Sequence, residues 1–553
     1  MCPFVSLAYR YLESASQDLQ FRDIFITMDD TLYFMTTALL ISVVIWIVNP
    51  FGKLHNLLRQ LLKDPKENLP DGVRSFKDLP GPKGLPYFGD ILNYIKTSSD
   101  FNRLLKNRQE NFEKYGPIYK RTVMGRTVIF IKNPTDVEAV FRGDGIHPMR
   151  PEMIFRAQKE YMISKNLPEG LTTLEGEKWS RLRKALAPKM LRPKGIRENL
   201  DNFNGVARDA ITHMAALRGI GDEIPDLEGE LSKYATESIG TMAFDVRVGL
   251  FDDPPSKETK KMLKMIKAVF DGFALLGKLN SGWEGLLYRF IKTPSYKKFV
   301  ETQDITFSTS QEIIDRKVME LNKMAEEGEQ FPENQAVPML AYLIMKGDLT
   351  PKEISVNSIF MFRAGVETTT NGLLWVLYDL ARNPRVQEKV YEEVTSLIGT
   401  HGDFTPESFT KLEYIKACVK ESMRLHPVAL GWARVLTQDL VLSSYMVPAG
   451  TIVSYSNYLS GRSEELFKLP LEFRPERWLN EDLGKIHPFA SLPFGVGSRM
   501  CIGRRIAEAE IYLLTAKLVQ RFTMEYHDEP MGTKLSFLAV PDRPLKIKFI
   551  DRE

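Results

Sequence analysis

The 553-residue chain has the composition of an ordinary globular protein, with 43% hydrophobic and 26% charged residues, which excludes a fibrous or intrinsically disordered chain. The net charge of +3 indicates no dedicated nucleic-acid partner. Three cysteines are an odd and sparse set, which argues against a disulfide framework and favours a reducing compartment.

The N-terminal region predicts a membrane anchor. Residues 1–30 are mixed and acidic, whereas residues 31–52 carry no charge and are long enough to span a bilayer, which takes about 20 apolar residues. A buried core helix is the alternative interpretation. Lys53, Arg59 and Lys63 follow the uncharged segment, and they place the rest of the chain on the cytoplasmic side if the helix inserts from the cytosol.

A linker and one large domain complete the predicted organisation. The linker comprises residues 53–86 and contains a hinge rich in proline and glycine at residues 67–86, with residues 79–82 as its stiff centre. Residues 87–553 form the domain, for which the pattern predicts mainly α structure with a small β region. The predicted elements are helices at 100–115, 175–191, 350–382, 412–425 and 503–522 and a β-hairpin at 122–131.

Helix 175–191 is strongly basic and carries Trp179 and Arg183 on one face, because residues four apart are neighbours on a helix surface. An indole N–H and a guanidinium group in this arrangement can both bind a carboxylate. Without further context the pair is also compatible with ordinary surface packing.

Helix 350–382 has strong boundary signals and an unusual middle. Thr350 is a predicted N-cap, Pro351 suits the first helical position, and Glu353 completes a capping box. At 1.5 Å per residue the helix is about 48 Å long, enough to cross a domain. Residues 364–370, with a glycine and three successive threonines, are poor helix formers and predict a local distortion.

The middle of this helix also carries groups that can handle protons. Glu367 can relay protons from solvent, and the adjacent Thr368 can hold a water molecule or donate a hydrogen bond. Arg363 lies one turn earlier, and a mid-helix arginine must be paired or reach a polar cavity. We hypothesise that Arg363 meets an acidic group of the substrate or forms a structural ion pair.

Helix 412–425 carries two sets of charged residues. Glu421 and Arg424 are neighbours at i and i+3, and Arg477 follows later in the chain; a carboxylate between two guanidinium groups can be buried at tolerable cost. Lys416 and Lys420 lie about 140° and 100° around the helix from Glu421 and can face outward. The angular separation from both Glu421 and Arg424 is clearer for Lys416. The alternative interpretation is that the two lysines only form a solvated face of the helix.

The segment Phe494-Gly-Val-Gly-Ser-Arg-Met-Cys501-Ile-Gly503 places one cysteine in a glycine-rich loop directly before a helix. Glycines permit a tight turn and allow a flat ligand to approach the backbone. The free N–H groups and the dipole at the start of the helix favour the thiolate form of Cys501. A cysteine thiolate can be the axial ligand of a haem iron.

The spacing Phe-x-x-Gly-x-Arg-x-Cys-x-Gly resembles the haem-binding loop of cytochromes P450, and the resemblance extends from about residue 75 to the C-terminus. It implies the predominantly helical P450 fold, with haem b bound through the Cys501 thiolate in a loop bounded by Phe494 and Gly503. It also implies that haem propionates are bound by Trp179, Arg183, Arg434 and Arg499, that Glu367 and Thr368 form the oxygen-activation pair, and that Glu421, Arg424 and Arg477 form the structural Glu-Arg-Arg triad.

The redox partner and the compartment remain open. The pattern Lys416-x-x-x-Lys420-Glu-x-x-Arg resembles mitochondrial P450 enzymes, in which such lysines dock an acidic ferredoxin. Residues 1–30, however, are neither rich in arginine nor poor in acidic residues, as a mitochondrial presequence should be. An uncharged span followed by lysines is typical of an endoplasmic reticulum anchor, for which an NADPH diflavin reductase is the alternative donor. Both the mitochondrial inner membrane and the endoplasmic reticulum are therefore compatible locations.

The resemblance implies a membrane-bound monooxygenase that inserts one oxygen atom of O₂ into a lipophilic substrate, using electrons from NADPH. A sterol, a secosteroid, a fatty acid and a xenobiotic are all compatible substrates. One alternative is a P450-type isomerase or dehydratase that acts on peroxides, although such an enzyme does not need the acid–alcohol pair. The other is a non-catalytic haem-thiolate sensor.

Overall fold

The computed structural model describes residues 69–86, 88–328, 337–479 and 485–552. The predicted N-terminal segment 1–30, the predicted membrane helix 31–52 and the linker up to residue 68 lie outside these residues. Within the described residues, no helix combines the length and the apolar character needed to cross a membrane. The described chain belongs almost entirely to one compact unit, residues 71–553.

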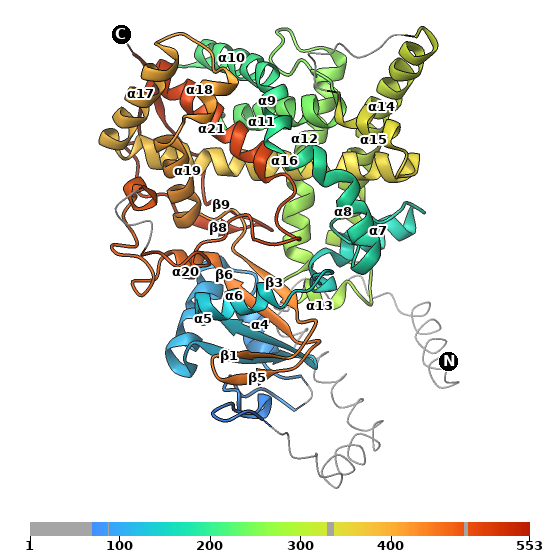
Figure 1. Cartoon of the computed structure of the whole chain (residues 1–553), viewed down its shortest axis with the longest axis vertical. Coiled ribbons are helices and arrows are strands. Elements are labelled where there is room, and N and C mark those ends of the chain that lie inside the picture. Colours follow the sequence, from blue (N-terminus) through green and yellow to red (C-terminus); the bar gives the residue numbers. More distant parts are fainter. Residues whose placement is uncertain (1–68, 87, 329–336, 480–484, 553) are drawn as a thin grey trace, which may run out of the picture. The chain divides into compact units, whose positions relative to one another are not determined.

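The described part of the unit is mainly helical with a small β region, as the sequence predicts (Figure 1). Its earlier helices are η1 (Phe76–Asp78), α4 (Ile91–Thr97), α5 (Phe101–Tyr115), α6 (Pro134–Arg142), η2 (Glu152–Phe155), α7 (Arg156–Ser164), α8 (Gly176–Met190), α9 (Pro193–Glu198), α10 (Leu200–Leu217), α11 (Leu227–Phe244), α12 (Lys257–Leu279), α13 (Glu284–Leu287) and α14 (Pro294–Glu326). The later ones are α15 (Met339–Lys346), α16 (Pro351–Ala381), α17 (Pro384–Ile398), α18 (Pro406–Thr410), α19 (Tyr414–Leu425), α20 (Asn457–Gly461), η3 (Pro475–Trp478) and α21 (Arg504–Arg521).

The five helices predicted from the sequence are confirmed as α5, α8, α16, α19 and α21, with ends that differ by at most two residues. The capping box at the start of α16 is present, with Thr350 and Glu353 each accepting a backbone N–H bond from the other. The sequence predicted a local distortion in the middle of α16, but the helix runs without a break from Pro351 to Ala381. The hydroxyls of Thr368 and Thr370 bond to carbonyls one turn earlier and are thereby accommodated inside the helix.

The strands form a four-stranded sheet and three two-stranded sheets. In the larger sheet the order is β1 (Ile118–Val123), β2 (Arg126–Ile131), β6 (Ile452–Ser456) and β3 (Gly431–Val435), and only the β2–β6 pair is parallel. The predicted hairpin is confirmed as β1–β2, whose register pairs Ile118 with Ile131. The smaller sheets pair β4 (Leu440–Leu442) with β5 (Tyr445–Val447), β7 (Phe522–Glu525) with β10 (Lys548–Asp551), and β8 (Thr533–Leu535) with β9 (Ala539–Pro541).

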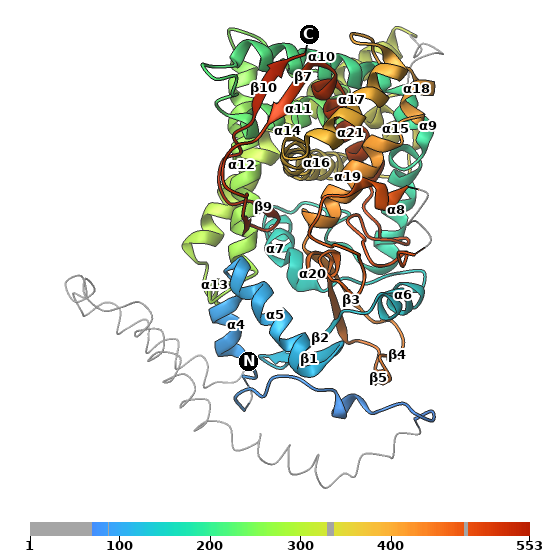
Figure 2. The same cartoon turned by 90° about the vertical axis from the view of Figure 1, so that its left-hand side faces the viewer.

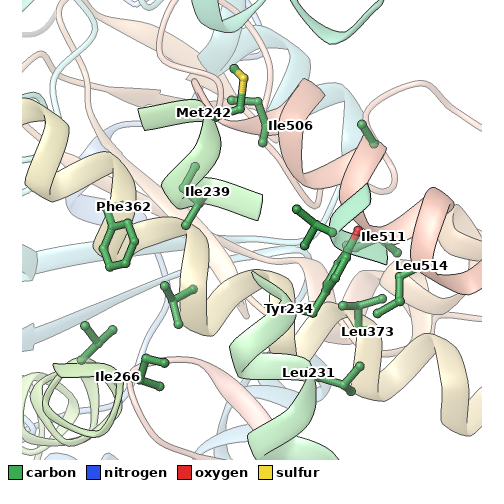
Figure 3. Packing of buried hydrophobic residues seen from close by; sticks show 14 of the residues in the cluster. Leu231, Tyr234, Ile239, Met242, Ile266, Phe362, Leu373, Ile506, Ile511 and Leu514 are labelled. Carbon is green, nitrogen blue, oxygen red and sulfur yellow. The ribbon is translucent and has the colours of Figure 1, made fainter. Parts of the chain in front are cut away.

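The hydrophobic core lies where α11, α16 and α21 pack together (Figure 3). Two glycines of α16 allow this close approach. A Cβ atom on Gly365 would come within 2.9 Å of the Ile239 side chain, and one on Gly372 would come equally close to Ile511. In Figure 2 the sheet β1–β2 and helices α4 and α5 lie at one end of the unit, and α10 and α17 lie at the other. The core thereby holds the middle of α16 and the N-terminal end of α21 in fixed positions.

Candidate functional site

The loop that carries Cys501 is held in shape by its own backbone. The Cys501 amide donates to the Phe494 carbonyl at 2.9 Å, and the Met500 amide donates to the Gly497 carbonyl at 3.1 Å. Gly495 and Gly497 have φ angles of +69° and +79°, a region that side chains other than glycine rarely adopt. Helix α21 begins directly after Gly503, as the sequence predicts.

Cys501 differs from the other described cysteine in its surroundings. Cys418 is buried in the core, whereas the Cys501 side chain is reached by solvent. The Cys501 thiol is nevertheless surrounded by protein, and this desolvation raises its pKa; the Gly503 N–H and the guanidinium groups of Arg150 and Arg183 act in the opposite direction. The expected lowering of the pKa by the helix is therefore outweighed by desolvation. A coordinated metal ion deprotonates a thiol outright, so metal binding would supply the missing stabilisation of the thiolate.

Two arginines contact the backbone of the Cys501 loop. Arg183 on α8 donates to the Met500 carbonyl at 2.9 Å, and Arg150 donates to the Arg499 carbonyl at 3.3 Å. Burial and repulsion from Arg499 and Arg434 lower the pKa of Arg150 to about 9, so this group remains a cation at neutral pH. Sequence reasoning missed Arg150, because no local pattern marks it and its contacts are distant in the chain.

The two other predicted arginines lie in the same cluster. Arg499 bonds to the Glu175 carboxylate at 2.8 and 2.9 Å, and its guanidinium lies 4.5 Å from the centre of the Trp179 ring. Arg434 on β3 donates to Asp144 at 3.0 Å. The pKa of Arg499 is lowered first by burial and also by the charge of Arg434, while Glu175 opposes both effects. The predicted Trp179 is buried, and its indole packs against the Arg499 guanidinium.

The charges of this cluster do not balance among the described residues. Four guanidinium groups, those of Arg150, Arg183, Arg434 and Arg499, face two carboxylates, those of Asp144 and Glu175. Buried positive charge is costly unless it is paired. The excess of two positive charges beside the Cys501 loop therefore favours a ligand with two negative charges.

The predicted acid–alcohol pair lies in the middle of α16. Glu367 is 3% exposed, its Oε2 atom has no hydrogen-bond partner, and burial raises its pKa well above the usual glutamate range, against the opposing charge of Arg363. The Thr368 hydroxyl donates to the Ala364 carbonyl at 2.7 Å, so it remains free to accept a hydrogen bond. Thr368 and Ala364 are reached by solvent, whereas Glu367 points into protein.

Arg363 forms no ion pair with the described residues, which excludes the structural alternative of the hypothesis for that part of the chain. It is 3% exposed and donates to the amide oxygen of Gln303 at 2.7 Å. Its guanidinium also lies 4.8 Å from the centre of the Phe273 ring. A neutral amide and an aromatic face stabilise this cation only in part, and burial lowers its pKa to about 10, against the opposing effects of Glu367 and Tyr161.

The predicted triad is assembled around a fully buried carboxylate. Glu421 accepts from Arg424 at 2.7 and 2.9 Å and from Arg477 at 2.8 Å. It also accepts from the Trp478 indole and the Arg474 amide, both at 2.9 Å, which the sequence did not predict. The two arginines in turn bond to backbone carbonyls of residues 461–472, so this network fastens α19 to the segment that leads to the Cys501 loop.

The two predicted docking lysines differ in exposure. Lys420 is exposed, with its ammonium group 4.0 Å from the centre of the Trp478 ring. Lys416 is less exposed than Lys420: it is half-buried and donates to the Thr410 carbonyl at 2.8 Å. Lys416, which the angular count separates more clearly from Glu421 and Arg424, is thus the less exposed of the two lysines, because its side chain folds back onto the preceding turn. Neither lysine forms an ion pair with the described residues. Lys420 lies near Arg504, whereas Lys416 lies near Glu393, Glu413 and Glu508 as well as Arg505.

Comparison with known proteins identifies the family. The cytochrome P450 family model matches residues 79–549, so the chain belongs to the cytochrome P450 family of monooxygenases. Similar proteins include "1,25-dihydroxyvitamin D(3) 24-hydroxylase, mitochondrial" of Mus musculus, 32% identical over 481 residues, which are 87% of this chain and 90% of the relative. "Cytochrome P450 10" of Lymnaea stagnalis is 31% identical over 496 residues, 87% of each chain. "Probable cytochrome P450 12a5, mitochondrial" of Drosophila melanogaster is 33% identical over 460 residues, 79% of this chain and 84% of the relative.

This family binds haem b through a cysteine thiolate. The described residues fit such a group, because haem carries two propionates and the arginine cluster has two positive charges without a carboxylate partner. The Cys501 loop, with two glycines in the left-handed region, leaves the thiol accessible beside that cluster. The predicted cofactor is thus confirmed at the level of the family, and the assignment of individual ligands belongs to the proposal below.

Proposed function

We propose that this P450 enzyme inserts one oxygen atom of O₂ into a lipophilic, sterol-like substrate and receives its electrons from an acidic ferredoxin. The observation that carries the proposal is the combination of an accessible Cys501 thiol, an adjacent cluster of arginines with excess positive charge, and a buried acid beside an alcohol on α16. A thiolate-bound haem iron supplies O₂ activation, with electron density from sulfur favouring cleavage of the O–O bond.

The chain's own residues have distinct roles in this proposal. Cys501 would hold the haem iron through its thiolate, and the Gly503 N–H together with Arg150 and Arg183 would stabilise the negative charge of the sulfur. Arg183, Arg434, Arg499 and the ring of Trp179 hold the propionates. We add Arg150 to this set because it donates to the loop carbonyl beside Cys501.

Glu367 and Thr368 manage protons. The raised pKa keeps Glu367 protonated at a pH where an exposed glutamate is ionised, so it can donate a proton and be recharged from solvent. Thr368, whose proton is engaged by the Ala364 carbonyl, accepts a hydrogen bond from a water molecule and orients it. Because peroxide-rearranging P450 enzymes do not need such a pair, its presence favours a monooxygenase that uses O₂.

We expect Glu367→Gln to lower turnover by about 100-fold, in the range that general acid–base groups contribute. In the unmodified enzyme turnover should fall as pH rises through the raised pKa of Glu367, because the proton donor is then lost. This decline should be absent in Glu367→Gln, whose amide does not titrate. Initial rates of substrate hydroxylation measured across pH provide the test.

Glu510→Gln is the matched control for this prediction. Glu510 on α21 is also buried, with burial raising its pKa to about 8, but its carboxylate accepts from Thr369 on another face of α16. The control should retain the turnover of the unmodified enzyme and its pH profile. If both variants lost turnover equally, the loss would follow from removing any buried acid in this region. That result would contradict the specific role of Glu367.

Mitochondrial electron supply is supported by Lys416 and Lys420 and by the names of several relatives. Both lysines lie on α19 and neither forms an ion pair with a described residue. Lys420 lies near the positive charge of Arg504, whereas Lys416 lies near Glu393, Glu413 and Glu508 as well as Arg505, so Lys420 contributes more to the positive potential of this surface. A surface of this kind complements an acidic protein and accelerates its association. The vitamin D 24-hydroxylase and the insect P450 among the relatives carry "mitochondrial" in their names, and we propose the same compartment and a secosteroid or sterol as substrate class.

The remaining part of the proposal is the anchor. Residues 31–52 span the membrane and residues 53–86 connect them to the haem domain, residues 87–553. Only the sequence supports this, because the anchor lies outside the described residues. The inner mitochondrial membrane is the location we favour, with the endoplasmic reticulum as the alternative.

The experiment that tests the donor compares two reduction systems under carbon monoxide. One contains NADPH, ferredoxin and ferredoxin reductase, and the other contains NADPH and a diflavin reductase, with dithionite as the chemical control. We expect the red-shifted band of thiolate-bound ferrous haem with the ferredoxin pair and with dithionite. If the band formed with the diflavin reductase system and not with the ferredoxin pair, the proposed donor would be wrong.

Replacing both docking lysines should weaken ferredoxin binding selectively. We expect Lys416→Gln/Lys420→Gln to raise the KM for ferredoxin by at least tenfold with little change in kcat, and to reduce the salt dependence of that KM. Lys257→Gln/Lys260→Gln is the matched control, because both residues are exposed on α12 and the loss of charge is the same. An equal KM for the two double variants would contradict docking on α19.

A further inference from the structure

Arg363 has no role in the function proposed above, although it lies on the same helix as the proton donor. Arg363 and Glu367 are four residues apart on α16, so they are neighbours on one face of the helix. Both side chains are 3% exposed. Opposite charges interact strongly in such a setting, because little water is present to screen them.

Each of the two side chains carries a buried polar atom without a hydrogen-bond partner among the described residues. On Arg363 this atom is the donor Nε, and on Glu367 it is the acceptor Oε2. Arg363 forms no ion pair with the described residues, so the donor and the acceptor lie on one helix face without being joined. Unbonded buried groups are costly, and a direct bond or one bridging water molecule would satisfy both.

Neutral groups of two other helices hold Arg363 in place. Its Nη1 atom donates to the Gln303 amide oxygen on α14 at 2.7 Å, and its guanidinium lies 4.8 Å from the centre of the Phe273 ring on α12. Both helices pack against α16 (Figure 2). Gln303 is fully buried, and its amide nitrogen donates to the Thr302 hydroxyl at 3.3 Å, which orients the amide. These contacts fix the guanidinium without supplying a negative charge.

The charges around Glu367 act in opposite directions. Burial raises the pKa of Glu367, the Arg363 charge opposes this effect, and Glu228 on α11 reinforces it. Tyr161 on α7 also lies near Arg363, but burial and a hydrogen bond to Asp304 raise the pKa of Tyr161, so its hydroxyl is neutral. Arg363 is therefore the positive charge that favours the ionised form of Glu367.

We propose that Arg363 is a positioning residue for proton transfer, which binds the Glu367 carboxylate, directly or through one water molecule, each time Glu367 has given up its proton. In this step the O–H bond of Glu367 breaks, its electron pair stays on the carboxylate, and the proton passes to the water that Thr368 orients. Solvent later returns a proton to Glu367. The inference rests on the proposed role of Glu367 and adds a residue that this role does not include.

The chemistry of the guanidinium and its neutral surroundings both suit this role. A guanidinium remains charged throughout and offers parallel N–H bonds to a carboxylate. A permanent carboxylate partner would cancel the charge of Arg363, whereas the amide of Gln303 holds the group and leaves the charge in place. The carboxylate of Glu367 exists for only part of the cycle, and Arg363 can stabilise it during that part.

Two variants separate the charge of Arg363 from its other contacts. Arg363→Gln offers an N–H donor in place of the guanidinium but loses the charge, whereas Arg363→Lys keeps the charge. Loss of the charge leaves the effects of burial and Glu228 unopposed, so Glu367 should hold its proton to higher pH. We expect the pH at which turnover declines to rise by about one unit in Arg363→Gln, the lower end of the effect of a nearby opposite charge, and to stay unchanged in Arg363→Lys.

An infrared titration of the resting haem protein provides a readout that does not depend on turnover. The band of the protonated Glu367 carboxyl is assigned by its absence in Glu367→Gln, and its loss with rising pH follows the ionisation of Glu367 directly. The midpoint of this titration should move upward in Arg363→Gln by the same amount as the turnover profile. The carbon monoxide band of each variant reports independently that the haem site is intact.

Lys352→Gln is the matched control, because Lys352 is exposed on the same helix, about 16 Å from Arg363 along its axis, and loses the same charge. It should leave the infrared midpoint and the pH profile unchanged. Arg363→Met takes the place of Arg363→Gln if the latter does not fold. An infrared midpoint that is the same in the neutral variant and in the unmodified enzyme would overturn the proposal. Full turnover by Glu367→Gln would instead refute the proton donor itself, whatever the infrared midpoints are.

Discussion

Glu421→Ala is expected to lower the free energy of unfolding by about 3 to 5 kcal/mol, the usual effect of removing one member of a buried ion pair. The Glu421 carboxylate is fully buried and accepts from both Arg424 and Arg477. Its removal leaves two buried guanidinium groups without their anion, and no solvent is available to replace it. The thermal unfolding midpoint of the purified protein and the haem bound per chain measure the effect.

The matched control is a carboxylate whose ion pair is exposed. Glu465 pairs with Lys132 at 2.8 Å, but its side chain is 66% exposed, so Glu465→Ala should cost less than about 1 kcal/mol. If Glu421→Ala prevents folding altogether, Trp478→Phe gives a milder test, since it removes a single indole bond to the same carboxylate. An unfolding midpoint for Glu421→Ala no lower than that of the Glu465→Ala control would contradict a structural role for the triad.

The triad also illustrates what the sequence makes predictable. Glu421 and Arg424 are one turn apart on a helix with a clear amphipathic pattern, so their contact follows from helix geometry alone. The Cys501 loop is similar, because its glycines and the following helix lie within one short segment. Helix ends were predictable where a capping residue or a proline marks them, as at Thr350 and Pro351.

Contacts between distant segments were not predictable in the same way. Arg150 and Arg499 are 349 residues apart, and Arg499 and Glu175 are 324 residues apart, so no periodicity relates them. The sequence indicated Arg499 only through resemblance to a known family and did not indicate Arg150 at all. The direction of a side chain within its helix is a related difficulty. Lys416 folds back to the Thr410 carbonyl, a local bond that an angular count around the helix axis does not include.

Electrostatic balance was the least predictable property. The helix at Cys501 predicted a lowered thiol pKa, but desolvation of the thiol by the surrounding protein outweighs the helix. Burial depends on packing from many segments, which no local pattern encodes. The surroundings of Arg363 were equally hidden, since a sequence shows that an arginine is present but not which side chains face it.

Cys501→Ser should abolish the red-shifted band of the ferrous–carbon monoxide complex and reduce hydroxylation below detection. A serine hydroxyl is a much weaker ligand than a thiolate and does not supply the electron density that favours O–O cleavage. Haem should still be present in reduced amount, because Arg434 and Arg499, the residues we propose to bind its propionates, are unchanged in this variant. A dithionite-reduced spectrum and the haem content per chain measure both effects.

Cys418→Ala is the matched control for the axial ligand. Cys418 is buried in the core on α19, and burial raises its pKa well above the usual range of a thiol. The control should retain the red-shifted band, since this thiol lies in the hydrophobic core and away from the arginine cluster. A Cys501→Ser protein that keeps the band, or a Cys418→Ala protein that folds but loses it, would show that the iron is bound elsewhere and would overturn the assignment on which the proposed chemistry depends.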